Sequence, residues 1–130
     1  MIHEEICTYE VCKLAKEKGF PQDVFGTCEM KSSCYLEDGR FYKDGCIYPI
    51  ENAYTAPTQS QLQRWLREEK NIHIEIVATA CGYFWIADKT NGTAITDSDV
   101  LDRGTNEGGC FDTFELCLED ALKYILQNLV

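Results

Sequence analysis

The cysteine at position 110 is the side chain of this sequence that is best placed for nucleophilic chemistry. It follows Gly108 and Gly109, which would let the backbone approach a ligand, and it precedes a helix predicted to begin at Asp112. The positive end of a helix dipole lowers the pKa of a nearby thiol and so favours the reactive thiolate. The carboxylates of Asp112 and Glu115 crowd the same helix start and oppose this effect.

A cysteine nucleophile also needs a base, and His73 is the histidine that could supply one. It lies in a predicted strand with its side chain outward, from where it could reach the loop that carries Cys110. The other histidine, His3, is near the terminus. Cys110 and His73 are therefore the candidate catalytic residues. The alternative is a buried structural cysteine and a solvent-facing histidine.

The remaining spacings do not match the common metal and cofactor motifs. The eight cysteines include no Cys-x-x-Cys pair, and only two histidines are available to complete a zinc site. Asp97, Asp99 and Asp102 could offer oxygen ligands to calcium, but their loop lacks the EF-hand spacing. Walker A, dinucleotide-binding, Gly-x-Ser-x-Gly and His-Glu-x-x-His motifs are also missing. We expect neither a metal nor a cofactor.

Length and composition indicate one ordinary domain, residues 1–130, with 45% hydrophobic residues for a core. No apolar run approaches the ~20 residues that cross a bilayer, and the first residues lack the features of a signal peptide. We therefore expect a soluble protein of a bacterial cytoplasm with free thiols and no membrane attachment. The net charge of −10 repels phosphate backbones, so we expect no direct binding to nucleic acids.

The elements that must position these residues begin with a helix of about ten residues in "TYEVCKLAKEKGFP", residues 8–21. Thr8 can cap its start, Gly19 suits the left-handed position after its end, and Pro21 prevents continuation. The next segment is aromatic and rich in turns. Asp38-Gly39 and Asp44-Gly45 are flanked by strand-forming residues there and predict one or two short hairpins.

A second helix is predicted from the stretch "APTQSQLQRWLRE", residues 56–68. Thr58 and Gln61 form a capping box at its start, and Arg64 can pair with Glu68 on its outer side. Its apolar face consists of Leu62, Trp65 and Leu66. The helix should end near Lys70-Asn71.

Three strands should follow, the first in residues 72–79. Alternation predicts inward positions for Ile72, Ile74, Ile76 and Ala78, with His73 and Glu75 outward. An apolar strand, "YFWIAD", comes next, and Asn91-Gly92 is a strong hairpin motif that sends the chain back through a third strand.

A long C-terminal helix closes the sequence. Asp112 and Glu115 form a second capping box, with Phe111 and Leu116 as a hydrophobic staple. Its apolar stripe comprises Phe114, Leu118, Ala121, Leu122, Ile125 and Leu129. The fold class is therefore α+β, an antiparallel sheet with helices packed on one face. Residues 56–130 form an α-β-β-β-α subregion, and residues 1–55 form a helix with short hairpins.

The same residues carry a family resemblance. The stretches "APTQSQLQRWLREEKNIHIEI", "GYFWI" and "FDTFELCLEDALKYIL" resemble small uncharacterised proteins encoded in phages and prophages of gut Bacteroidetes. The similarity covers residues 54–130, and "LAKEKGF" near the start also fits. The resemblance implies a phage or mobile-element origin, and it supplies no catalytic residue.

Two further likenesses concern the second half of the chain. Its α-β-β-β-α order is that of double-stranded-RNA-binding domains, but their basic helix start is missing and "FDTFELCLEDAL" opens with acids. The closing "GGCFDTFELCLEDALKYIL" is similar to the end of HicB-type antitoxins. An antitoxin of this type is therefore an alternative, and the net charge of −10 would also suit a protein that mimics DNA.

Aromatic side chains could form a recognition surface, because tyrosine and tryptophan supply large contact areas at small entropy cost. The candidates are Tyr35, Phe41, Tyr42, Tyr48, Tyr54, Tyr83 and Trp85. Alternatively, these side chains belong to the hydrophobic core or cover a face of the sheet. The sequence favours a protein-interaction or accessory module that binds another protein through an acidic, aromatic-bearing surface. A cysteine-nucleophile enzyme is the alternative, and the sequence leaves the oligomeric state open.

Overall fold

A computed structural model describes residues 5–22, 24–25, 29–30, 33–43, 53–80, 82–89, 94–96 and 110–130. In this part of the chain, three helices combine with antiparallel sheets, which confirms the predicted α+β class. The chain divides into two compact units, residues 1–58 and 59–130. Their boundary falls close to the predicted limit between the subregions 1–55 and 56–130.

Unit 1 is built around helix α1, Tyr9–Glu17, whose two ends are capped as predicted. At its start, the Thr8 hydroxyl accepts a backbone hydrogen bond from the first turn. At its end, Gly19 has φ +97°, and the N–H of Phe20 donates to the carbonyl of Ala15 at 2.9 Å. This is a Schellman motif, which needs a left-handed residue and so explains the glycine.

Short strands form the rest of unit 1. Their bounds are β1 Val24–Phe25, β2 Glu29–Met30, β3 Cys34–Tyr35, β4 Phe41–Tyr42 and β5 Tyr54–Thr55. Strands β1 and β2 pair with each other, while β3 lies between β4 and β5 in an antiparallel sheet. The hairpin predicted at Asp38-Gly39 connects β3 to β4, with Gly39 at φ +92°. The one predicted at Asp44-Gly45 lies outside the described residues.

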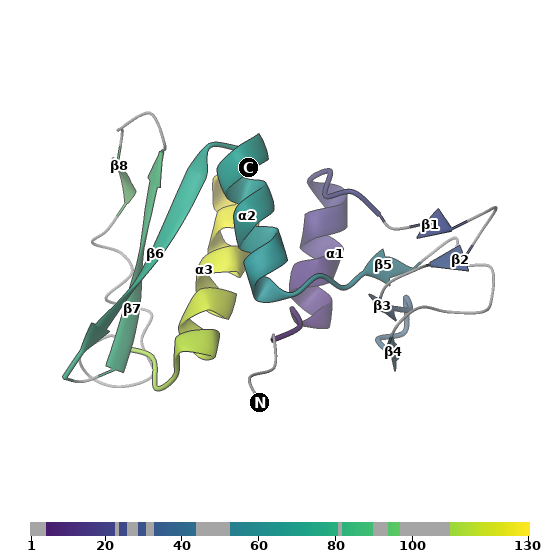
Figure 1. The fold of residues 1–130 in the computed structure, drawn as a ribbon, viewed down its shortest axis with the longest axis horizontal. Helices are drawn as coiled ribbons and strands as arrows, with labels where there is room; N and C mark the ends of the chain where they lie inside the picture. Colours follow the sequence, from purple (N-terminus) through teal and green to yellow (C-terminus); the bar gives the residue numbers. More distant parts are fainter. Residues whose placement is uncertain are drawn as a thin grey trace. The chain divides into compact units, whose positions relative to one another are not determined.

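Unit 2 has two helices on one face of an antiparallel sheet, as predicted (Figure 1). The helices are α2 Gln59–Glu69 and α3 Phe114–Asn128, and the strands are β6 Ile72–Thr79, β7 Gly82–Lys89 and β8 Ala94–Thr96. The sheet order is β6-β7-β8. Helix α2 packs on β6, and α3 packs on both β6 and β7. The Asn91-Gly92 turn lies outside the described residues, but β7 and β8 are antiparallel, as a hairpin there requires.

The core of unit 2 lies between this sheet and the two helices. Its buried apolar side chains are Leu62, Leu66, Ile72, Ile74, Trp85, Ala87, Cys117, Leu118, Ala121, Leu122, Ile125 and Leu126. Gln59 is also buried, and its Nε2 donates to the Glu115 carbonyl and to the Glu119 carboxylate, both at 2.9 Å. These bonds join the start of α2 to the first turns of α3. On the outer side of α2, the predicted Arg64–Glu68 pair is present at 3.0 Å.

Five side chains predicted to be inward are more exposed than expected: Trp65, Ile76, Ala78, Phe114 and Leu129. Ala78 is exposed, because a helix rises about 1.5 Å per residue and a strand about 3.3 Å, so α2 covers only the first part of β6. Trp65 is half-buried, with the Lys70 ammonium 5.3 Å from its ring centre. Phe114 is 43% exposed, because it lies at the very start of α3.

The predicted capping box at Asp112 is wrong by one residue. Helix α3 begins at Phe114, and its N-cap is Thr113, whose hydroxyl accepts from the N–H of Leu116 at 3.1 Å. Phe111 is paired with a neighbouring strand, which keeps the chain extended one residue longer than expected. Leu116 is 52% exposed while Phe111 is buried, so the two do not form the predicted staple.

Candidate functional site

The aromatic residues proposed as a recognition surface separate into different environments. Trp85 is fully buried in unit 2, where its indole N–H donates to an Asp120 carboxylate oxygen at 3.0 Å. It is therefore a core residue and not part of a surface. Tyr48 lies outside the described residues. Tyr83 contacts Phe114 edge-on, and Tyr42 packs against buried Cys34 in unit 1.

The other three candidates, Tyr35, Phe41 and Tyr54, form a row across the sheet of unit 1. Tyr35 in the central strand β3 lies opposite Phe41 of β4 on one side and opposite Tyr54 of β5 on the other. Residues directly opposite one another in an antiparallel sheet project to the same face. The Tyr35 and Phe41 ring centres are 5.0 Å apart.

Tyr9 of α1 completes the cluster. Its ring lies edge-on to Tyr35 and to Tyr54, with centre separations of 5.8 and 5.7 Å. This edge-to-face arrangement is favourable for aromatic pairs. We call the four residues Tyr9, Tyr35, Phe41 and Tyr54 the aromatic patch. Sequence reasoning missed Tyr9 because it was assigned only to a helix, and nothing local predicts which strand residues a helix end will meet.

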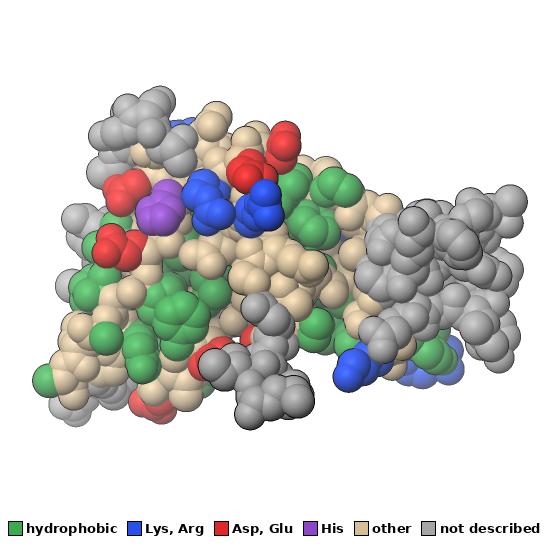
Figure 2. Space-filling view, viewed as in Figure 1, with side chains coloured by type: hydrophobic (Ala, Val, Ile, Leu, Met, Phe, Trp, Pro, Cys, Tyr) green, Lys and Arg blue, Asp and Glu red, His purple; other side chains and the backbone are tan. Residues whose placement is uncertain are grey.

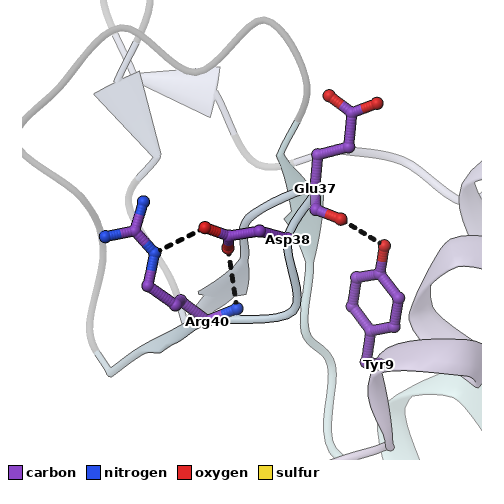
Figure 3. A network of polar contacts seen from close by, with 4 residues as sticks. All are labelled: Tyr9, Glu37, Asp38 and Arg40. Atoms are coloured by element: carbon purple, nitrogen blue, oxygen red, sulfur yellow. Dashed lines mark hydrogen bonds and ion pairs between the residues drawn. The ribbon is translucent and has the colours of Figure 1, made fainter.

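Polar contacts hold the patch in place. The Tyr9 hydroxyl donates to the carbonyl oxygen of Glu37 at 2.6 Å, which ties α1 to the β3–β4 turn (Figure 3). In the same turn, the side chain of Asp38 accepts from the backbone N–H of Arg40 at 3.1 Å and from its guanidinium at 2.8 Å. The Tyr35 hydroxyl donates to the Cys7 carbonyl at 3.1 Å. The rings of Tyr9 and Tyr35 are thus held by the backbone at one end and by a hydrogen bond of the hydroxyl at the other.

Charges of both signs border the patch. The Lys16 ammonium lies 5.2 Å from the centre of the Tyr54 ring, within cation–π range, and also donates to the Ala53 carbonyl at 3.1 Å. Burial raises the pKa of the Tyr54 hydroxyl, and nearby Tyr9 and Glu37 add to the increase. The hydrogen bond from the Arg40 N–H lowers the pKa of Asp38. At neutral pH, Tyr54 is therefore a neutral phenol and Asp38 a carboxylate.

Exposure identifies the open end of the patch. Tyr9, Tyr35 and Tyr54 are half-buried, whereas Phe41 is 43% exposed on strand β4. A phenyl ring has no polar atom to direct to water, so this exposure has no role in solvation. Phe41 is consequently the side chain of the patch that is most available to a binding partner.

The structure does not bring the candidate catalytic residues Cys110 and His73 together. Cys110 is buried, and its Sγ lies 3.6 Å from the Oγ1 of Thr79, at the far end of β6. His73 lies near the start of the same strand, and the two ends are roughly 20 Å apart at the usual rise of a strand. His73 is exposed, and Figure 2 shows histidine at the surface beside basic and acidic side chains.

The residues around Cys110 have structural roles. The next residue, Phe111, exchanges backbone hydrogen bonds of 2.7 and 2.8 Å with Tyr83 of β7. A Cβ at Gly82 would collide with the Phe111 carbonyl, so this close approach requires glycine. Burial, followed by the effects of Asp120 and Cys110, raises the pKa of the Cys117 thiol to about 12. Cys117 is therefore a protonated core residue at neutral pH.

The described residues contain no group of three or more His, Cys, Asp or Glu side chains arranged to hold a metal ion. The proposed oxygen ligands Asp97, Asp99 and Asp102 lie outside that part of the chain. The five described cysteines, Cys7, Cys12, Cys34, Cys110 and Cys117, form no disulfide with one another. No described helix has both the length and the apolar character needed to cross a membrane.

Comparison of the chain with protein-family models, with curated proteins and with solved structures gives no match. The resemblance to phage and prophage proteins stays a prediction.

Proposed function

We propose that the protein is a small interaction module that binds another protein through the aromatic patch of unit 1. The observation that carries this proposal is the 43% exposure of Phe41 at the open end of a row of packed rings. Aromatic side chains at the centre of an interface commonly contribute most of its binding energy. Rings that are already held in place also lose little conformational entropy when a partner binds.

The charges near the patch support a protein as the partner. The positively charged residues Lys16 and Arg40 lie beside it, as do two acidic residues, Glu37 and Asp38. A nucleic acid could stack on the rings, but the net charge of −10 opposes the approach of a phosphate backbone. A polypeptide with apolar side chains and charges of both signs suits such a surface better.

The proposal needs no cofactor and no metal. It places the protein in the cytoplasm of a bacterial host, as an accessory protein of phage or mobile-element origin, and the origin rests on the sequence resemblance alone. The cysteine-enzyme alternative loses support, because the buried Cys110 thiol and the exposed His73 lie at opposite ends of β6. The antitoxin and DNA-mimic alternatives remain untested predictions.

Replacement of Phe41 by serine tests the proposal. Phe41→Ser removes the exposed ring with little loss of core packing, so the variant should stay folded and bind its partner roughly 10-fold more weakly or worse. The immobilised wild type and variant would be compared for the proteins that each retains from a lysate of a Bacteroidetes host, and the affinity of a retained protein would be measured by titration.

Leu116→Ser is the matched control, because Leu116 is a similarly exposed apolar residue of unit 2, at 52%. A partner of the patch is retained by the wild type and by Leu116→Ser but is lost with Phe41→Ser. If the wild type and Phe41→Ser retain the same proteins with equal affinity, the aromatic patch is not the binding surface. Retention of nucleic acid by the patch at low salt would contradict the choice of a protein partner.

A further inference from the structure

Strand β6 of unit 2 is an outer strand of its sheet, with β7 on one side only in the part of the chain described (Figure 1). The outer side of such a strand presents backbone N–H and C=O groups that can pair with another strand. Most proteins protect these edges with lysine, proline, a bulge or a covering element. We therefore ask, for each residue of β6, whether its outward backbone groups are covered.

The pairing of β7 shows which backbone groups of β6 point outward. Tyr83 directs both its N–H and its C=O to Phe111, on the side of β7 away from β6. Ala78, which lies opposite Tyr83, is therefore in a non-hydrogen-bonded pair with it. Because the two kinds of pair alternate, Ile74 and Ile76 are also in non-hydrogen-bonded pairs, and their backbone groups point away from β7.

The first part of this edge is protected and the second part is not. The outward carbonyl of Ile74 accepts from the side-chain amide of Gln63 on α2 at 3.1 Å. The exposed residues His73 and Glu75 flank this position. Beyond it, Ile76–Thr79 contains no charged residue and no proline, and the described residues offer no partner to the outward groups of Ile76 and Ala78. We call Ile76–Ala78 the free edge.

We propose that the free edge pairs with the free edge of a second copy of the chain, antiparallel and about a two-fold axis at Val77. Ile76 of each copy then faces Ala78 of the other, and each such pair exchanges both N–H···O=C bonds. The result is one continuous sheet through two copies of unit 2. Such an interface is self-complementary, as a two-fold dimer requires. The inference is independent of the function proposed for the aromatic patch.

Two observations select this register for the second copy. An axis at Ile76 would pair Ala78 with Ile74, whose carbonyl is already bonded to Gln63, and an axis at Glu75 would place two carboxylates opposite each other. The axis at Val77 uses only the outward groups of Ile76 and Ala78, to which the described residues offer no partner. It also brings Val77 beside Val77 of the second copy, and each of these lies opposite a half-buried Phe84 on β7. An apolar row then runs without interruption across the interface.

Val77→Lys tests the interface, because it would place two ammonium groups directly opposite each other at the axis. Light scattering after gel filtration should give twice the chain mass for the wild type and the single chain mass for Val77→Lys. His73→Lys is the matched control: it adds a positive charge to the same face of the same strand, outside the free edge, and should remain dimeric. A monomeric wild type at high protein concentration, or a dimer that survives Val77→Lys, would overturn the proposal.

Cysteine cross-linking tests the register without adding charge. Opposite residues in a non-hydrogen-bonded pair have Cα atoms about 4.5 Å apart, which is within the range that a disulfide spans. Val77→Cys should therefore form a covalent dimer under mild oxidation much faster than the wild type, whose native thiols set the background. Glu75→Cys, on the same face, should not exceed that background. Faster cross-linking of Glu75→Cys, or none above background for Val77→Cys, would refute this pairing.

Discussion

The surroundings of a thiol decide whether it can act as a nucleophile. Cys117 is fully buried, and its pKa is raised to about 12 by burial and by its neighbours Asp120 and Cys110. Cys110 is itself buried against Thr79. Both thiols therefore contribute to packing, although the glycines before Cys110 and the helix after it are features that reactive cysteines often have.

The raised pKa of Cys117 predicts a loss of stability at alkaline pH. The thiol of the unfolded chain ionises around its ordinary pKa of 9.0, whereas the folded protein keeps the proton up to about 12. The stabilisation is therefore complete below pH 9.0 and decreases as the pH rises from there towards about 12. We expect the difference in free energy of unfolding between the wild type and Cys117→Ala to shrink over this range.

Urea titrations followed by tryptophan fluorescence would measure this difference, since both tryptophans, Trp65 and Trp85, lie in unit 2. Leu118→Ala is the control, because it removes a neighbouring buried side chain that does not titrate. The loss in free energy of unfolding that Leu118→Ala causes should be the same at every pH. If the loss in free energy of unfolding caused by Cys117→Ala also stays constant above pH 9.0, the folded protein does not keep the thiol protonated beyond its ordinary pKa.

At the scale of elements, the start of α3 depends on a tertiary contact. The sequence pattern places a capping box at Asp112, but the bonds between Phe111 and Tyr83 hold the preceding residue in a strand-like pairing. Thr113 then becomes the residue whose hydroxyl reaches the N–H of Leu116. A helix cap predicted from local sequence can thus shift by one residue when a neighbouring strand captures the chain before it.

Two alanine substitutions distinguish the observed cap from the predicted one. Thr113→Ala removes the side-chain acceptor and should lower the free energy of unfolding by about 1 kcal/mol. Asp112→Ala removes only a charge near the positive end of the helix and should cost about 0.5 kcal/mol or less. Urea unfolding of both variants gives the comparison. If Asp112→Ala lowers the free energy of unfolding more than Thr113→Ala does, the helix is capped at Asp112, as the sequence pattern predicts, and not at Thr113.

At the scale of the whole molecule, the chain divides into two compact units, and each contains buried side chains. Unit 2 contains a core of aliphatic residues around Trp85, with Gln59 joining its two helices. The described residues of unit 1 are organised differently, with short strands, one helix and the aromatic patch. The two proposed interaction sites also divide between them, with the aromatic patch in unit 1 and the free edge in unit 2.

The buried core within unit 2 predicts that this unit folds by itself. A fragment of residues 59–130 should give a circular dichroism spectrum of mixed helix and strand and a cooperative thermal transition. We expect it to be less stable than the full chain, since a core in a domain of about 70 residues supplies only a few kcal/mol. The same fragment carrying Leu122→Ala should lose about 3 kcal/mol and serves as a check that the transition reports the core. A fragment without a cooperative transition would contradict the prediction.

The sequence by itself determined the helices, the order of the strands in unit 2 and the hairpin at Asp38-Gly39. These follow from interactions between residues close in the chain: periods of 3.6 and 2, caps such as Thr8 and Gly19, and turn residues that fix a reversal.

Only the tertiary structure decided which residues can act together. It buried Trp85, left Phe41 exposed, added Tyr9 to the aromatic patch and separated Cys110 from His73 by most of the length of β6. These outcomes depend on which distant segments pack against one another and on how far a helix reaches along a strand. Local periodicity carries no information about either, because the same pattern is compatible with several neighbours.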